Sequence, residues 1–207
     1  MKILDEGKCE EISESLEGME EIFCEEEDVE TPYTRKELSL KEGGFTDDDC
    51  EQTSYFNAHP GALGAIDQLG PGAPMRYIDE RKERINQLLD FYISLYDSTE
   101  VLAFNYNDES FWEFESKDEY VKLMEKSIKS EYTMAPLLWE GEKLTKFEEE
   151  FYDNDNPFIS VYLPKLKSII VGDYDFTHHL FCWRSSAINQ IMGLCSKHDI
   201  YVYDPEL

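Results

Sequence analysis

Apolar residues recur with a helical period in three parts of the chain. Residues 8–27, 78–96 and 185–196 each place their apolar side chains on one face of a helix. The first stretch carries a narrow apolar stripe between many glutamates, which predicts an amphipathic helix that has to pack against another part of the protein. A fourth helix is predicted to begin after Ser116, because Ser116 and Glu119 have the spacing of a capping box.

Between these helices the pattern changes to short runs of β-branched and aromatic residues, which predict strands. Residues 101–106 and 111–114 are predicted to form a hairpin. The further predicted strands cover residues 158–163, 167–171, 176–183 and 200–203. Strand hairpins that are interrupted by helices indicate an α+β fold, in which an antiparallel or mixed sheet has helices packed on one face.

The pattern weakens between residues 31 and 52, and glycines and prolines follow between residues 61 and 74. This composition predicts a boundary near residue 75. Residues 1–75 are expected to form an acidic amino-terminal segment with one amphipathic helix and a Gly/Pro linker. Residues 76–207 are expected to form the α+β domain and to fold without that segment.

The net negative charge of the chain indicates which classes of partner it can bind. The 207 residues include 46 Asp and Glu against 19 Lys and Arg, a formal net charge of −27. Such a chain is repelled by phosphate backbones and by anionic lipids, so nucleic acid and membrane are not expected as partners. Negative potential instead favours association with a basic protein, because complementary charges speed the encounter.

Nineteen of the acidic residues lie within the first 51 positions, where two runs stand out. These runs, together with two tryptophans that could anchor an interface, are the candidate partner-binding residues: Glu25, Glu26, Glu27, Asp28, Asp47, Asp48, Asp49, Trp112 and Trp139. Acidic runs are also typical of a solvated surface or a mobile segment, and this alternative stays open.

The cysteine content and the amino-terminal sequence indicate the cellular compartment of the protein. Five cysteines at irregular spacing do not suggest a disulfide framework. The first residues turn acidic before an apolar signal region can form, and no apolar run approaches the ~20 residues that cross a bilayer. We therefore expect a cytoplasmic protein.

One set of residues has the spacing of a zinc site. His179 and Cys182 are separated by two residues, as are Cys195 and His198, with twelve residues between the pairs. The alternative is that Cys182, in a predicted strand, and Cys195, on the apolar face of a predicted helix, are core thiols. We prefer the core interpretation and expect neither a bound metal nor another cofactor.

A second set surrounds a predicted turn. Asp173, Asp175, His178 and His179 could bind a divalent metal or perform acid and base chemistry. The alternative is that the aspartates serve the turn, since neighbouring strand residues such as His178 and His179 point to opposite faces. No motif of a phosphate-binding loop, a serine hydrolase or a zinc protease occurs.

Residues 186–191, Ser-Ala-Ile-Asn-Gln-Ile, and residues 195–205, which end in Tyr-Asp-Pro, form an alanine-bearing helix followed by a short strand. This pattern resembles small bacterial immunity proteins of polymorphic toxin systems. The resemblance implies neutralisation of a toxin by direct binding in the cytoplasm. The favoured hypothesis is thus an acidic, non-enzymatic inhibitor of a basic partner such as a toxin or nuclease.

Two alternatives stay open. A viral anti-defence protein that mimics nucleic acid would use the same negative surface. A small metal-dependent hydrolase would use Asp173, Asp175 and a nearby histidine, and it would show bound metal and activity without a partner.

Overall fold

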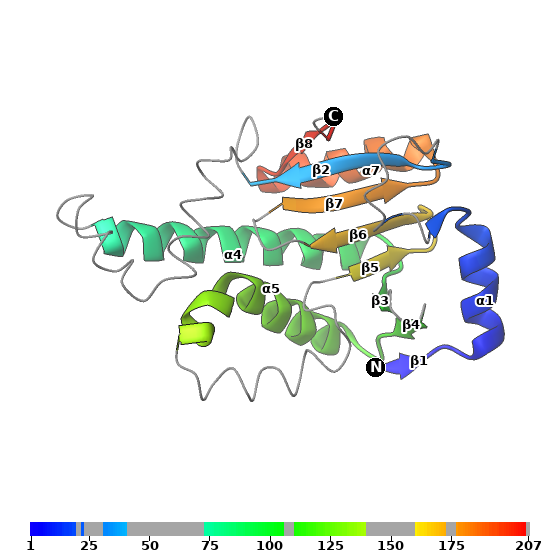
Figure 1. Cartoon of the computed structure of the whole chain (residues 1–207), viewed down its shortest axis with the longest axis horizontal. Coiled ribbons are helices and arrows are strands. Elements are labelled where there is room, and N and C mark those ends of the chain that lie inside the picture. The colour runs from blue at the N-terminus through cyan, green and yellow to red at the C-terminus, as the bar shows by residue number, and fades with distance from the viewer. Residues whose placement is uncertain are drawn as a thin grey trace.

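The described strands form one antiparallel sheet, as a computed structural model shows (Figure 1). The structure describes residues 1–19, 22, 31–40, 73–105, 110–139, 160–172 and 177–205. Its strands are β1 (Lys2–Ile3), β2 (Thr34–Ser39), β3 (Leu102–Asn105), β4 (Ser110–Glu113), β5 (Ser160–Leu163), β6 (Ser168–Gly172), β7 (Thr177–Cys182) and β8 (Tyr201–Tyr203). Its helices are α1 (Glu6–Ser15), α4 (Ala73–Ser98), α5 (Lys117–Trp139), α7 (Ser185–Cys195) and the 3₁₀ helix η3 (Ser196–His198).

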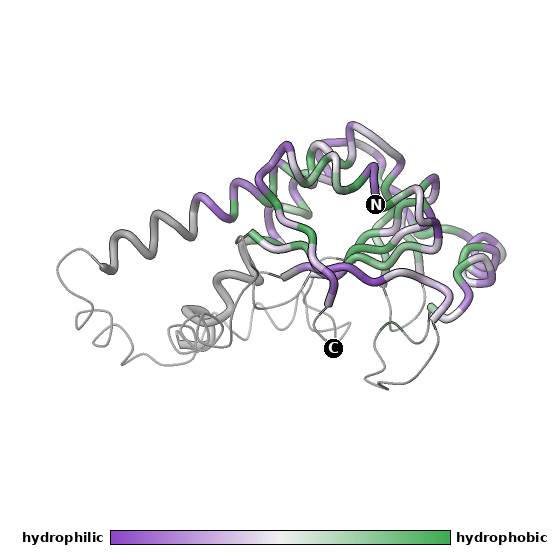
Figure 2. The backbone as a smooth tube through the Cα atoms, turned by 90° about the horizontal axis from the view of Figure 1, so that it is seen from above, coloured by the Kyte–Doolittle hydropathy of each residue, from purple (hydrophilic) through white to green (hydrophobic). Residues whose placement is uncertain are grey.

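The strand order in the sheet is β1-β4-β3-β5-β6-β7-β2-β8, and all the paired strands are antiparallel. The predicted α+β class is thereby confirmed. The helices predicted over residues 78–96 and 185–196 correspond to α4 and α7, and the predicted hairpin is β3–β4. In Figure 2 the hydrophobic residues gather along the central strands, as expected for a sheet that is buried between other elements.

The helices α4, α5 and α7 cover one face of the sheet, which we call the helix face. Their apolar residues share one core cluster with strand residues such as Val161, Ile170 and Leu180. Two hydrogen bonds tie the helices to each other and to the sheet. The hydroxyl of Tyr120 in α5 donates to the carbonyl oxygen of Tyr92 in α4 at 2.9 Å, and the hydroxyl of Tyr92 lies 2.6 Å from Nδ1 of His178 in β7.

The opposite face, which we call the α1 face, has a core of its own. Leu16, Met19 and Ile22 are buried there together with strand residues such as Phe111 and Ile169. Figure 1 shows α1 standing apart from the other helices. The amphipathic stretch predicted at the amino terminus thus finds its packing partner on this face of the sheet.

The first helix is shorter than the predicted 8–27, because α1 ends at Ser15. Asp5 caps its amino terminus by accepting a hydrogen bond from the backbone amide of Lys8 at 3.1 Å. Beyond its end, Gly18 has a φ of 73°, a left-handed conformation that favours glycine and turns the chain away from the helix. The apolar residues after α1 therefore lie in turns, and not in a continuation of the helix, and from these turns they pack into the core.

The predicted capping box of α5 is present in modified form. The backbone amide of Glu119 donates to Oγ of Ser116 at 3.2 Å, as expected. The carboxylate of Glu119 reaches back to the amide of Glu115, at 2.9 Å, instead of the amide of Ser116. It also pairs with the amino group of Met1, which fixes the start of the chain beside α5.

The predicted boundary near residue 75 needs correction, because strands from both sides of it belong to the same sheet. β2, from the first 40 residues, pairs with β7 along its whole length and with β8 on its other side. β1 pairs with β4. The amino-terminal residues are thus part of the α+β unit and not an appendage to it, and the reason is hydrogen bonding between segments far apart in the chain.

Candidate functional site

The residues predicted to bind a partner are only partly described by the structure. The acidic runs Glu25–Asp28 and Asp47–Asp49 lie outside the described residues, so their role stays a prediction. Trp112 is half-buried in β4, and its indole Nε1 donates to Oγ of Ser110 at 2.8 Å. Trp139 is the last residue of α5, and its side chain lies outside the described residues.

The four residues with zinc-like spacing are divided between the two faces of the sheet. Cys182 lies on the helix face, where Oγ of Ser168 is 3.3 Å from its sulfur. His179 lies on the α1 face with Phe181. The ring of His198 faces α4, with Nε2 2.7 Å from Oγ of Ser94. Among the described residues no group of three or more His, Cys, Asp or Glu side chains could hold a metal ion.

The second candidate set is described only through its histidines, since Asp173 and Asp175 lie outside the described residues. His178 is 1% exposed and contacts Tyr92 within the core of the helix face. His179 lies on the opposite face, where it is 3.4 Å from a guanidinium nitrogen of Arg35. The two imidazoles therefore point away from each other, as the alternation of a regular strand requires.

The thiols of Cys182 and Cys195 are core groups. Burial raises the pKa of the Cys182 thiol, and the hydrogen bond from Ser168 opposes this effect in part. Burial raises the pKa of the Cys195 thiol from 9.0 to about 12. Neither environment favours the thiolate that metal ligation or nucleophilic attack requires.

We expect Cys195 in the folded protein to react with iodoacetamide at pH 8 about 1,000-fold more slowly than in the urea-unfolded chain. The reason is that only the thiolate reacts, and its population falls about tenfold for each unit by which the pKa is raised. Peptide mass spectrometry after timed labelling measures both rates, with half-buried Cys9 as the internal reference. Equal rates for Cys195 in folded and unfolded chains would show that this thiol is not buried.

The feature best suited to binding is a groove on the α1 face, of about 410 Å³, which we call the α1 groove. Its residues come from α1 and the segment before it, from β3 and the residues just before it, from β4, and from the residue that follows β5: Leu4, Lys8, Glu11, Ile12, Ser15, Glu100, Leu102, Glu113 and Pro164. The apolar members form a hydrophobic lining, and Leu102 among them is only 5% exposed. Carboxylates reach the same groove from α1, from the segment just before β3 and from β4.

The sheet explains why carboxylates from separate segments meet there. Glu113 in β4 lies directly opposite Leu102 in β3, so both side chains lie on the same face. Glu100 precedes Leu102 by two residues, and Glu11 approaches from α1. The α1 groove therefore contains three carboxylates and one ammonium group, that of Lys8. These glutamates were not among the predicted site residues, because no local sequence pattern distinguishes them from the many other acidic residues.

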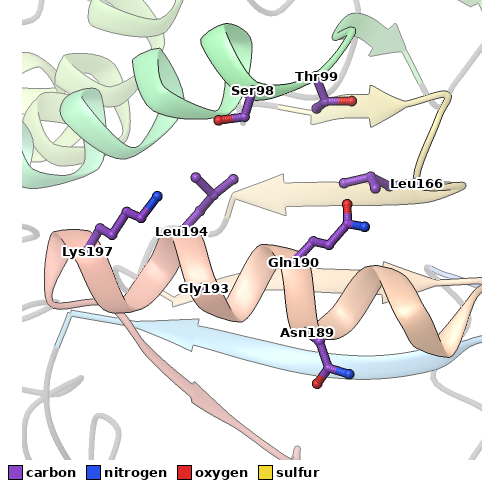
Figure 3. A pocket seen from close by; sticks show the side chains of 8 residues that line it. All are labelled: Ser98, Thr99, Leu166, Asn189, Gln190, Gly193, Leu194 and Lys197. Carbon is purple, nitrogen blue, oxygen red and sulfur yellow. The ribbon is translucent and has the colours of Figure 1, made fainter.

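A second groove, of about 330 Å³, lies on the helix face between α7 and the end of α4 (Figure 3). Gln190 and Leu194 point from α7 toward the side of the groove where Ser98 ends α4 and Thr99 follows it. The lining is mostly uncharged, and its one charged side chain is that of Lys197. This groove thus offers hydrogen-bonding groups but no negative charge.

The chain matches no protein-family model, no curated protein and no solved structure. Within the part of the chain that the structure describes, no helix has the length and apolar character needed to cross a membrane.

Proposed function

We propose that this protein is an acidic inhibitor of immunity type, which neutralises a basic protein such as a toxin or a nuclease by direct binding. The net charge of −27 is the observation that carries the proposal. A surface of this sign accelerates the approach of a basic partner and disfavours acidic ones. The use of cysteine and the resemblance to immunity proteins support a cytoplasmic location.

The α1 groove supports the proposal because it combines negative charge with an apolar lining. Charges at the rim of an interface mainly set the rate of association, whereas buried apolar contacts set how long the complex lasts. A groove that offers both kinds of contact is suited to a partner with cationic side chains. The second groove, between α7 and the end of α4, has by contrast no carboxylate among its lining residues.

The test is the salt dependence of association with a basic protein that the tagged chain captures from its native host. The association rate should fall steeply between 0.01 M and 0.15 M salt, as the Debye length shortens from about 30 Å to about 8 Å. Dissociation should change less. Reversal of either acidic run to lysine, Glu25–Asp28 or Asp47–Asp49, should lower the association rate by about tenfold or more if that run faces the partner.

A control must separate local charge from total charge. The control reverses four exposed acidic residues outside the runs, namely Glu10, Glu14, Glu83 and Asp90. It changes the net charge by the same amount as reversal of the first run, Glu25–Asp28. If reversal of an acidic run lowers the association rate more than this control does, that run contacts the partner. Association rates that respond neither to salt nor to charge reversal would mean that the acidic residues serve solubility alone.

A further inference from the structure

The α1 groove has a hydrophobic lining that is open to solvent. Leu4, Ile12, Leu102 and Pro164 contribute the apolar part, from three parts of the chain. An occupant that covers these side chains gains the free energy of removing apolar surface from water. An aliphatic chain of a few carbon atoms fits this lining better than a polar group does.

Glu11, Glu100 and Glu113 add negative charge to the same groove. Glu11 and Glu113 form no ion pair or hydrogen bond through their side chains within the part of the chain that the structure describes. Among the described residues, Glu100 has only a long contact, 4.0 Å, with the exposed ammonium group of Lys165. The carboxylates are thus available to a cation that enters from solvent.

The ammonium group of Lys8 offsets this charge only in part. Its Nζ lies 3.8 Å from Oδ2 of Asp5, the residue that caps α1, and both side chains are more than half exposed. Lys2 lies opposite Glu113 in the β1–β4 ladder, but no ion pair joins the two among the described residues. The lining as a whole therefore keeps an excess of negative charge.

An aliphatic stem that ends in a cation is the structure of a lysine or arginine side chain, and such side chains bury their stems along apolar surface while the charged end stays near polar groups. We propose that the α1 groove receives a lysine or arginine side chain of the basic partner. This inference rests on the proposed function and adds to it the place and the chemistry of one contact. The stem would cover Ile12 and Leu102, and the cation would lie among the three carboxylates.

The test uses the full chain and three short probe peptides that differ at one position: acetyl-Gly-Gly-Lys-Gly-Gly-amide and its norleucine and glutamate counterparts. Norleucine keeps the aliphatic stem without the charge, and glutamate reverses the charge. Nuclear magnetic resonance titration of the labelled protein should show shifts concentrated at Ile12, Leu102 and Glu113 with the lysine peptide. The norleucine peptide should give weaker shifts, and the glutamate peptide none at these positions.

Matched variants separate the groove from general attraction to an acidic protein. Glu11→Gln together with Glu113→Gln should weaken binding of the lysine peptide by about fivefold, since each exposed ion pair contributes modestly. Glu14→Gln is the control, because Glu14 lies on the same helix, one turn from Glu11, and does not line the groove. It should change the affinity by less than about twofold. Unchanged unfolding midpoints verify that each variant is folded.

Several results would overturn the inference. These are shifts spread evenly over acidic residues, equal effects of Glu14→Gln and Glu11→Gln, or equal binding of the lysine and norleucine peptides. The proposed function is judged separately, with the captured basic protein. If the double variant binds that protein with unchanged affinity and unchanged salt dependence, the inference about the groove fails while the proposed function stands.

Discussion

A chain that begins at residue 76 is expected to lose its cooperative unfolding transition, because it lacks a strand from within the sheet. β2 lies between β7 and β8, so its removal leaves the hydrogen-bonding edge of β7 open and separates β8 from the sheet. The same truncation removes Leu16, Met19 and Ile22, and it thereby uncovers the apolar side chains of the α1 face. Open strand edges and uncovered apolar faces also promote aggregation.

Urea denaturation followed by circular dichroism measures this effect, with the full chain as the reference. The matched control is a chain that begins at Leu4, which loses β1, a two-residue strand at the edge of the sheet, and the ion pair between the amino group of Met1 and Glu119. We expect this control to unfold cooperatively with a slightly lower midpoint. A cooperative transition in the chain that begins at residue 76, with the midpoint of the full chain, would restore the boundary that the sequence predicted.

The elements that the sequence predicted well are those whose signals are local. α4 and α7 have strong apolar periodicity, and their predicted and observed bounds differ by only a few residues at most ends. Ser116 and Glu119 marked the start of α5, and the structure confirms the bond that Ser116 accepts. In each case the residues that determine the element lie within a few positions of one another.

β2 was missed because its sequence, Thr-Arg-Lys-Glu-Leu-Ser, has one apolar residue in six. Its place in the sheet is determined by hydrogen bonds to β7 and β8, more than 130 positions away in the chain. Polar side chains are compatible with this strand since Lys36 pairs with Asp204 and Arg35 lies beside Glu37 and His179. No local rule detects a strand that is stabilised mainly by distant partners.

The α1 groove could not be predicted for the same reason. Its residues come from segments that are distant in the chain, and only the pairing of β3 with β4 and the packing of α1 bring them together. The candidate sites that were recognised from spacing, such as His179 and Cys182, depended on closeness in the chain. In a strand, however, residues an odd number of positions apart have side chains on opposite faces of the sheet, so they do not meet although they are close in the chain.

Both faces of the sheet are packed, as two neighbouring residues of β6 show. Ile169 and Ile170 are neighbours in β6, each is 0% exposed, and each belongs to the core of a different face. We expect Ile169→Ala and Ile170→Ala each to lower the free energy of unfolding by about 2–5 kcal/mol, since each leaves a cavity in a packed core. Denaturation in urea measures both values.

An exposed isoleucine in the same sheet, Ile3, is the matched control for these two variants. Ile3 is 51% exposed in the edge strand β1, so Ile3→Ala should change the free energy of unfolding by no more than about 0.5 kcal/mol. The contrary result is that Ile170→Ala lowers the free energy of unfolding strongly while Ile169→Ala lowers it no more than Ile3→Ala does. That result would mean that only the helix face is packed. In that case the residues that follow α1 would not cover the sheet, and the α1 groove would have no wall on that side. Similar losses at Ile169 and Ile170 would instead establish that the sheet is packed on both faces.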